Sequence, residues 1–279
     1  MIIKLIGANF SQNNIGKIEF APTLNAETLN ILSNYSRELS EEQQFAFQDY
    51  LLGLKNNNLW SSIKNLYLPL LAGKVGESFF NVKTNVIDCI PNSSDYVITS
   101  NNGLKCTAEI GSSPSSIATF PYTGSQNNLH CLFYNTSILV ENQDIIDGFA
   151  DNNAKWVTLT TGALNGNDRV GFVKTNNNKN VKFIGQSLLL SNSPTFQGWT
   201  QRTDGNAYIN AKGVTTGTSP IDTDQTYTNL PIKPFLRFNN SMNTGGSVEL
   251  GIISMGSSLT DEQMATYKNL TDVFISSLT

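Results

Sequence analysis

The side chains best suited to ligand chemistry surround an Asp-Gly pair in residues 196–214, FQGWTQRTDGNAYINAKGV. Asp204-Gly205 is a strong signal for a two-residue β-hairpin turn, because such turns need residues that tolerate a positive φ. That turn pairs Gln201 with Tyr208 across the hairpin. Because side chains alternate along a strand, one face is then polar apart from two aromatic rings. The residues on this predicted face are Gln197, Trp199, Gln201, Thr203, Asn206, Tyr208 and Asn210.

The predicted face has the composition of a binding site for a neutral sugar. Aromatic rings cover the C–H face of a sugar ring, while Gln and Asn side chains hydrogen-bond its hydroxyl groups. We therefore predict that Trp199 and Tyr208 bind a glycan, with Gln201, Asn206 and Asn210 as hydrogen-bonding partners. The alternative is that both rings pack against a loop or a neighbouring subunit.

Catalytic patterns are weaker than this hairpin. The single histidine, His130, lies in an apolar stretch that indicates a strand, so we expect a structural role rather than a base or a metal ligand. Glycoside hydrolysis needs two carboxyl groups flanking the scissile bond, and Glu249 in VELGII stands alone. We therefore expect that the protein is not an enzyme, with a glycoside hydrolase or lyase as the alternative.

Metal-binding patterns are also weak. Three aspartates lie beside two asparagines in the stretch QDIIDGFADNN, and such oxygen ligands suit Ca²⁺. Their spacing fits no EF-hand loop, so we expect a solvated acidic loop and no cofactor, with Ca²⁺ as the alternative. The cysteines show no C-x-x-C spacing and are expected to be small buried residues. The residues concerned are Asp144, Asp147, Asp151, Asn152 and Asn153, and Cys89, Cys106 and Cys131.

The overall composition argues against a nucleic-acid-binding protein and against a membrane-spanning protein. The 279 residues carry a formal net charge of −4, so there is no surplus of Lys and Arg to neutralise nucleic-acid phosphates. No apolar stretch reaches the ~20 residues that a membrane span needs. The apolar run in residues 1–5 is too short for a secretory signal, so we expect a soluble product made in a cytoplasm.

Residues 68–255 alternate short strand candidates with turn residues, the pattern of an all-β sandwich. A hairpin with a polar tip is predicted at residues 176–180, NNNKN. Pro231 and Pro234 indicate an edge strand or a strand start, because proline lacks the N–H that a central strand uses. The clearest strand candidates are residues 97–99, 104–107, 129–134, 155–161, 170–174, 181–184, 196–202, 206–210 and 235–238.

The C-terminal residues predict a strand followed by a capped helix. The stretch VELGIISM, residues 248–255, is rich in β-branched and apolar residues, so we expect a largely buried strand. Thr260 and Gln263 form a capping box, and Leu259 and Met264 occupy the positions of a hydrophobic staple. One apolar stripe of this helix should dock on the sheet. The stripe comprises Met264, Tyr267, Leu270, Phe274 and Leu278.

The first part of the chain is predicted to be a short hairpin followed by helices. Residues 2–6 and 15–20 are the two strand candidates of the hairpin. Helices are expected after Asn25 and after Ser40, which begins a second capping box. A third short helix is expected over residues 59–67, before Pro69 stops it.

These elements suggest a division of the chain into two regions. A lone hairpin and short helices bury little apolar surface by themselves, so they need a partner. We therefore assign residues 1–67 to attachment and oligomerisation through a closed symmetric assembly, and residues 68–279 to the β domain.

Three stretches resemble known proteins. The C-terminal sequence GSVELGIISMGSSLTDEQMATYKNLTDVFISSL resembles the end of concanavalin A-like, laminin-G-like jelly-roll domains of tailed-phage virion proteins. Residues 60–83, WSSIKNLYLPLLAGKVGESFFNVK, resemble the start of the same domains. The opening IIKLIGANFSQNNIGKI is similar to N-terminal segments of phage and prophage proteins from gut bacteria.

The resemblance implies both a fold and a function. The implied fold is mainly β, a two-sheet antiparallel jelly-roll sandwich with an N-terminal hairpin and short-helix neck and a C-terminal helix packed on the sandwich. The implied function is that of a structural virion protein, a fibre or appendage subunit whose outward domain binds a host surface glycan. We expect a homotrimer that contacts other virion proteins through residues 1–67. The alternatives are a concanavalin-like glycoside hydrolase or lyase, and a prophage-derived bacterial lectin.

Overall fold

The computed structural model shows a mainly β protein with a C-terminal helix, as the sequence predicts. Every strand pair among the described residues is antiparallel. The structure describes residues 22–88, 96–107, 120–125, 128–136, 143–150, 155–164, 167–176, 179–184, 196–202, 206–209, 214–218, 226–234 and 249–279.

The described strands form a ten-stranded and a six-stranded sheet. Along its main path the large sheet runs β14 (Val214–Thr218), β13 (Asn206–Ile209), β12 (Phe196–Gln201), β7 (Leu129–Asn135), β16 (Leu250–Gly256), β1 (Ile63–Tyr67), β2 (Phe80–Asn81) and β3 (Val86–Ile87). The hairpin β4 (Tyr96–Ile98) and β5 (Leu104–Cys106) joins it through β16. The small sheet runs β11 (Lys179–Ile184), β10 (Asn167–Asn176), β9 (Lys155–Leu164), β8 (Gln143–Ala150), β15 (Thr226–Pro234) and β6 (Phe120–Ser125).

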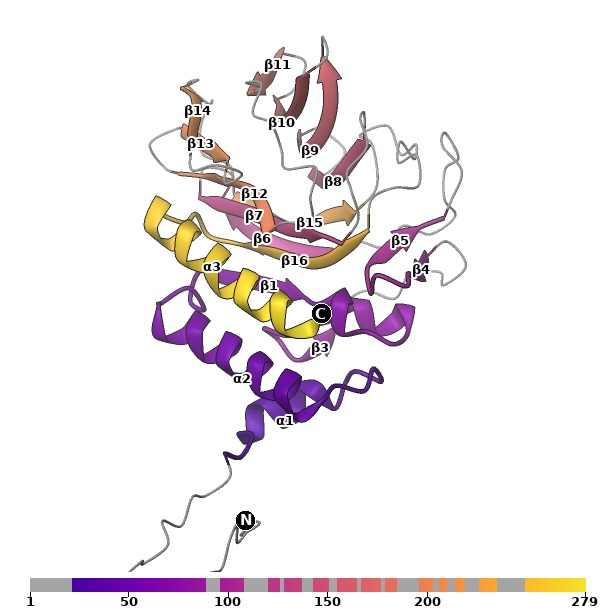
Figure 1. The fold of residues 1–279 in the computed structure, drawn as a ribbon. Coiled ribbons are helices and arrows are strands. Elements are labelled where there is room, and N and C mark those ends of the chain that lie inside the picture. The colour runs from indigo at the N-terminus through magenta and orange to yellow at the C-terminus, as the bar shows by residue number, and fades with distance from the viewer. Residues whose placement is uncertain are drawn as a thin grey trace, which may run out of the picture.

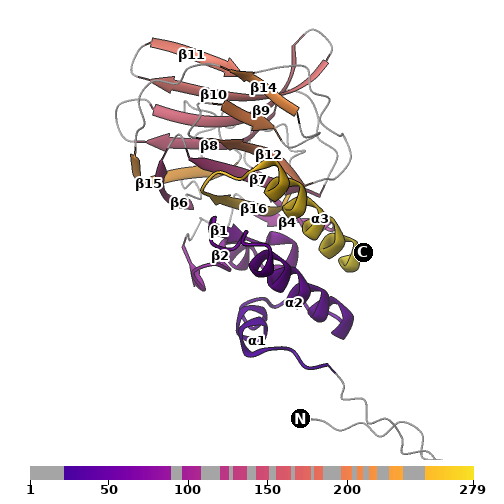
Figure 2. The ribbon, with the colours of Figure 1, turned by 90° about the vertical axis from the view of Figure 1, so that its left-hand side faces the viewer.

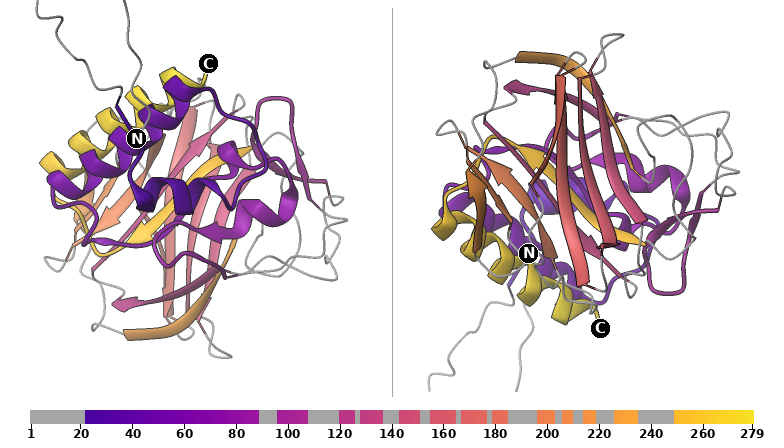
Figure 3. Two further views of the ribbon diagram at one scale, coloured as in Figure 1. Left: turned by 90° about the horizontal axis from the view of Figure 1, so that it is seen from below. Right: turned by 90° about the horizontal axis from the view of Figure 1, so that it is seen from above.

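Helices cover one side of the large sheet, and the small sheet lies beyond its other side (Figure 1, Figure 2). The helices are α1 (Ala26–Leu32), α2 (Glu41–Asn56) and α3 (Asp261–Leu278), and two short 3₁₀ turns, η1 (Pro69–Leu71) and η2 (Val75–Phe79), follow β1. Seen from below, α2 and α3 lie side by side (Figure 3). No helix in the described part of the chain is long and apolar enough to cross a membrane.

Strand β16 is buried along its whole length, which confirms the prediction from VELGIISM. Ile252 packs in the core shared with the helices, whereas Ile253 and Met255 are also fully buried but do not belong to that core. Because residues of odd and even number point to opposite faces of a strand, β16 must be covered on both faces. A strand covered on both faces has a continuous apolar sequence rather than an alternating one.

Helix α3 joins the large sheet to α2 through aromatic contacts. Tyr267 packs on Phe196 of β12 with ring centroids 4.9 Å apart. Two turns further along, Phe274 stacks on Tyr50 of α2 at 4.8 Å with the ring planes 13° apart. Burying an apolar side chain of this size stabilises a fold by about 1.5–3 kcal/mol relative to exposing it. The predicted apolar stripe is therefore the surface that attaches α3 to the rest of the protein.

The predicted starts of α1, α2 and α3 are confirmed. The Thr260 side chain accepts a hydrogen bond from the Gln263 N–H, and the Gln263 side chain bonds back to the Thr260 N–H, so the capping box is complete. Leu259 and Met264 are both buried, as a hydrophobic staple requires. The Ser40 capping box before α2 and the Asn25 N-cap before α1 are also present.

The helix predicted over residues 59–67 is wrong, because Ile63–Tyr67 forms strand β1 between β16 and β2. A β-bulge after Ile63 interrupts the strand, so its buried residues lose the strict alternation by which strands are recognised. The core cluster contains Ile63 and Leu66 together with Tyr50 and Phe274. Helices α1 and α2 thus pack into the same core as the rest of the described chain, while the attachment role of residues 1–67 stays a prediction.

Two proline positions also differ from expectation. Pro231 and Pro234 lie within β15, and β15 pairs with β6 on one side and with β8 on the other, so it is not an edge strand. The register of β15 with β6 shifts between Tyr227 and Leu230, which shows that this ladder is irregular beside the first proline. The predicted polar-tipped hairpin is confirmed as β10 and β11. The predicted hairpin in residues 2–20 and the strand at 235–238 lie outside the described residues.

Candidate functional site

Strand β12, which carries Trp199, lies between β13 and β7 rather than at the edge of the sheet. Its backbone passes unusually close to β7 at Gly198, where φ is 151°. A Cβ atom at Gly198 would lie 2.1 Å from the Cys131 carbonyl oxygen. Only glycine adopts this φ readily, so Gly198 fixes how β12 sits against β7.

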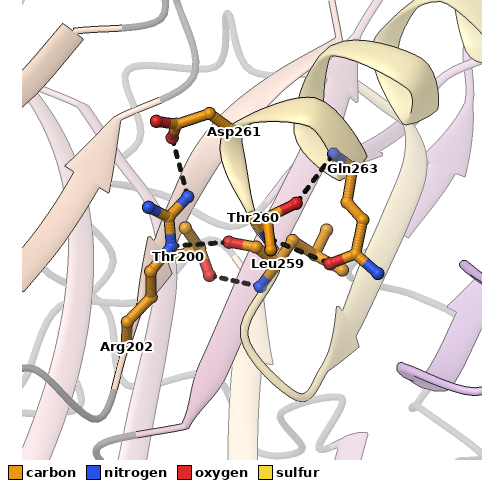
Figure 4. A network of polar contacts seen from close by, with 6 residues as sticks. All are labelled: Thr200, Arg202, Leu259, Thr260, Asp261 and Gln263. Atoms are coloured by element: carbon orange, nitrogen blue, oxygen red, sulfur yellow. Dashed lines mark hydrogen bonds and ion pairs between the residues drawn. The ribbon is translucent and has the colours of Figure 1, made fainter.

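The end of β12 is fastened to the start of α3 by side-chain hydrogen bonds (Figure 4). The Leu259 N–H donates to Thr200 Oγ1 at 2.9 Å, and Arg202 Nε donates to the Leu259 carbonyl at 2.8 Å. Arg202 also pairs with Asp261 of the first helical turn at 2.7 Å. Because Thr200 is fully buried beneath this joint, its face of β12 is the face that meets the helix.

The register predicted for the β12–β13 hairpin is wrong by one residue. The structure pairs Trp199 with Ile209, Thr200 with Tyr208, and Gln201 with Ala207. Five residues separate Gln201 from Ala207, and an odd number is incompatible with a two-residue turn in a regular ladder. When the pairing of two strands shifts by one residue, the side chains of one strand that shared a face with a given set on the other strand now lie on the opposite face from that set.

The corrected register separates the two ring-bearing positions. Position 199 has Ile209 and Cys131 as its cross-strand neighbours, whereas position 208 has Thr200 and Thr215. Tyr208 and Asn206 therefore share the face of Thr200, while Trp199 and Gln201 share the opposite face. Asn210 lies outside the described residues. Glycan binding by these residues stays a prediction, but no single face holds both rings.

Glu249 is the centre of a polar cluster that the sequence did not reveal. One of its carboxylate oxygens accepts hydrogen bonds from Thr99 at 3.0 Å, Asn101 at 3.2 Å and Thr136 at 3.3 Å. These donors come from the β4–β5 turn and from the end of β7, which are distant in sequence. The carboxylate thus links the small hairpin to β16, and among the described residues no second carboxyl group shares this cluster.

His130 is buried and structural, as predicted. Its Nδ1 lies 2.5 Å from the Ser257 carbonyl oxygen, which can only accept, so Nδ1 carries the proton and Nε2 accepts from Ser254 Oγ at 3.2 Å. Tyr267 donates to the same serine oxygen at 2.9 Å. Burial lowers the pKa of His130 to about 4, against the effect of the hydrogen bond to Ser257. Because Ser254 is also fully buried, no substrate can reach this Ser-His pair.

The predicted acidic loop is partly wrong. Asp144 and Asp147 lie in strand β8, and Asp151 lies outside the described residues. No group of three His, Cys, Asp or Glu side chains in the described part of the chain is placed to hold a metal ion. Cys131 is free and buried as expected, and burial raises the pKa of its thiol to about 12.

Neither a known protein family nor a curated protein matches the sequence. Among solved structures, domain 4 of an extracellular arabinanase from Geobacillus stearothermophilus, in complex with arabinotriose, has a TM-score of 0.50 at 13% identity, over 74% of this chain and 98% of that domain. The binding domain of botulinum neurotoxin serotype D has a TM-score of 0.46 at 10% identity, over 75% of this chain and 52% of that one. A Trypanosoma rangeli sialidase has a TM-score of 0.44 at 10% identity, over 82% and 39% of the two chains.

These matches concern the fold alone. The chain spans about half the length of the neurotoxin binding domain that it matches. The arabinanase domain is matched over nearly its whole length, so this chain has the general architecture of a complete domain of known structure.

Proposed function

We propose that this protein binds glycans without being an enzyme, on a two-sheet jelly-roll domain that needs no cofactor. The observation that supports glycan binding is the polar face of β13 beside the start of α3. On that face the register pairs Tyr208 with Thr200 of β12 and Thr215 of β14, and Asn206 with Thr218 of β14. An aromatic ring with amide and hydroxyl neighbours is the combination that sugar binding needs.

The corrected register makes the two rings unequal. The cross-strand neighbours of Trp199 are Ile209 and the buried Cys131, so its face has the composition of a core. The neighbours of Tyr208 are both threonines. We therefore assign the stacking role to Tyr208, with Asn206 and Asn210 as hydrogen-bonding partners, and a packing role to Trp199 and Gln201.

The fold likeness agrees with a saccharide ligand. The arabinanase domain of similar architecture was solved with arabinotriose, a neutral oligosaccharide. At 13% identity this likeness supports the architecture and not the position of the site, so the assignment to Tyr208 rests on the register of β12, β13 and β14.

Glycan-array binding and melting temperature, measured together on Tyr208→Ala and Trp199→Ala, test the assignment. We expect Tyr208→Ala to lose about 1 kcal/mol or more of binding free energy, because the substitution removes the ring that stacks on the sugar, and to change the melting temperature less than Trp199→Ala does, because the cross-strand neighbours of Tyr208 are polar threonines. Tyr208→Phe keeps the ring and should keep most of the binding. Trp199→Ala should instead lower the melting temperature. Unchanged glycan binding by Tyr208→Ala would show that the site is elsewhere.

We further propose that the protein is a fibre or appendage subunit of a bacteriophage virion, assembled as a homotrimer that contacts other virion proteins through residues 1–67. This part of the proposal rests on the sequence resemblance. Mass spectrometry of purified virions and light scattering of the full-length protein test it. The full chain is needed, because a cut after residue 67 would remove strand β1 from the centre of the large sheet. Absence from virions while the gene is expressed, or a monomeric mass, would count against it.

A further inference from the structure

A basic cluster surrounds Trp60 on this otherwise acidic protein. Residues 55–83 contain four lysines and a single acidic residue, although the whole chain has a net charge of −4. Two of these lysines lie against the Trp60 ring, and the charge of a third acts on one of them. Lys55, in the last turn of α2, and Lys83, after β2, contact the ring, whereas Lys64 lies in β1 and its charge acts on Lys83.

The ammonium groups are held in place by the tryptophan. Lys83 Nζ lies 4.4 Å from the centroid of the Trp60 ring and donates a hydrogen bond to the Trp60 carbonyl oxygen at 2.6 Å. Lys55 Nζ lies 5.5 Å from the same centroid. The ring itself packs against the hydrophobic core, so it is a fixed support for both cations. Cation–π contacts of this kind orient a charge without neutralising it.

The positive charge of the cluster exceeds the negative charge around it. Burial lowers the pKa of Lys83, and the charges of Lys64 and Lys55 lower it further, while Glu27 acts in the opposite direction. Glu27 pairs with Lys55 at an exposed site, where an ion pair is weak. An anion bound beside these lysines would relieve their mutual repulsion.

The acidic residue within this stretch, Glu77, uses its carboxylate to bind backbone N–H groups. Its carboxylate accepts hydrogen bonds from the backbone N–H groups of Ser36, Gly73 and Lys74, at 3.0, 2.9 and 3.3 Å respectively. It therefore holds the η1–η2 segment to the α1–α2 connection. The loop between Lys55 and Lys64 supplies Asn and Ser side chains and no acid.

The cluster lies at the same end of the large sheet as the proposed glycan face. The Ser257 N–H, in the turn before α3, donates to the Ser62 carbonyl at 2.8 Å. The same turn continues to Leu259, which is hydrogen-bonded to Thr200 of β12 and to Arg202, the residue after β12. Both features therefore flank the start of α3.

We propose that Lys55 and Lys83, held at the Trp60 ring, together with Lys64 of β1, bind an anionic saccharide through its carboxylate or phosphate groups. Three neighbouring cations suit a chain with spaced charges, whereas nucleic acid would need many phosphate contacts and this protein has no further surplus of cations. The choice of a saccharide rests on the proposed glycan-binding function. The cluster itself requires no residue of β12 or β13.

The test measures binding of the full-length protein to polygalacturonate, which carries carboxylates, and to phosphomannan, which carries phosphates, with dextran as the neutral control. Lys64→Gln is the principal variant, because Lys64 is exposed and its loss leaves the fold intact. Lys83→Gln is the second variant. Lys268→Gln is the matched control, since it removes one positive charge from α3, where Lys268 pairs with Asp272.

We expect Lys64→Gln and Lys83→Gln each to weaken binding about threefold or more, as loss of one partly screened charge pair does, and Lys268→Gln to have no comparable effect. Added salt should weaken binding of the wild type, because exposed charges are screened. Binding of one polymer rather than both identifies the anionic group. Absence of binding to both at low salt, equal binding by Lys64→Gln, equal losses in Lys268→Gln, or tighter binding to single-stranded DNA would overturn the inference. Tyr208→Ala should keep its affinity for the acidic polymer, so this test fails separately from the neutral-glycan test.

Discussion

The buried imidazole of His130 predicts that this protein loses stability in mild acid. Among the residues that the structure describes, the ring has no charged partner: its two nitrogens bond a backbone carbonyl and the hydroxyl of Ser254, and Tyr267 donates to the same hydroxyl oxygen. Protonation would place a positive charge in a fully buried site without an acid to balance it. The folded protein therefore resists protonation that the unfolded chain accepts freely.

The size of the effect follows from the two pKa values. The unfolded histidine has a pKa of about 6.5. In the folded protein burial lowers the pKa of His130 to about 4. As the pH falls below about 6.5, the unfolded state binds the proton first. The free energy of unfolding therefore has its full value above that pH and decreases as the pH falls toward 4. Integrating the difference in bound protons gives a loss of about 2 kcal/mol between pH 7.5 and pH 5.

Urea unfolding followed by tryptophan fluorescence, at several pH values across this range, measures the loss directly. The chain has one histidine, and Asp and Glu side chains ordinarily titrate below pH 5, so the window reports mainly on His130. His130→Gln cannot titrate, so it should be less stable at pH 7.5 but nearly independent of pH down to pH 5. A wild-type stability that stays constant over this range, or an equal slope in His130→Gln, would refute the reasoning.

Two further pairs of variants test how the sheet is held together. Gly198→Ala should destabilise the protein by more than about 2 kcal/mol, because the new Cβ meets the Cys131 carbonyl oxygen, whereas Gly76→Ala, whose Cβ would meet no atom within 4 Å, should have little effect. Similar midpoints of urea unfolding for the two variants would contradict this. Glu249→Ala should cost about 1–3 kcal/mol, because three hydrogen-bond donors lose their acceptor, while Glu249→Gln keeps an acceptor oxygen and should cost less. Equal losses in the two Glu249 variants would mean that the charge, rather than the hydrogen bonds, holds the β4–β5 hairpin.

The elements that sequence reasoning predicted correctly are those determined by local chemistry. The cap at Thr260 needs only a hydroxyl and a Gln three residues later, so its presence in the sequence is nearly sufficient. The same holds for Ser40. Strand β16 was predictable because covering on both faces makes its sequence apolar along almost its whole length, a pattern that can be recognised without knowing its neighbours.

The errors concern features determined by distant parts of the chain. Residues 63–67 form a strand because β16, nearly 200 residues later in the sequence, pairs with them. The bulge in β1 interrupts the alternation of buried and exposed residues by which a strand is recognised from sequence. Propensity is a weak guide where tertiary pairing decides. The cluster at Glu249 likewise joins residues near positions 100, 136 and 249, and no local pattern connects them.

The hairpin register shows why a site is harder to predict than a strand. Residues 196–201 and 206–209 were correctly expected to be strands, yet a shift of one residue changed which rings share a face. The register is fixed outside the hairpin, by Gly198 against β7 and by Thr200 and Arg202 against the start of α3. The same helix start connects, through Ser257 and Ser62, to the loop that carries Trp60. A saccharide long enough to reach from the Tyr208 face across the start of α3 to the lysine cluster at Trp60 binds the second surface intramolecularly. Its affinity should therefore exceed that of a short saccharide that reaches only one of the two surfaces.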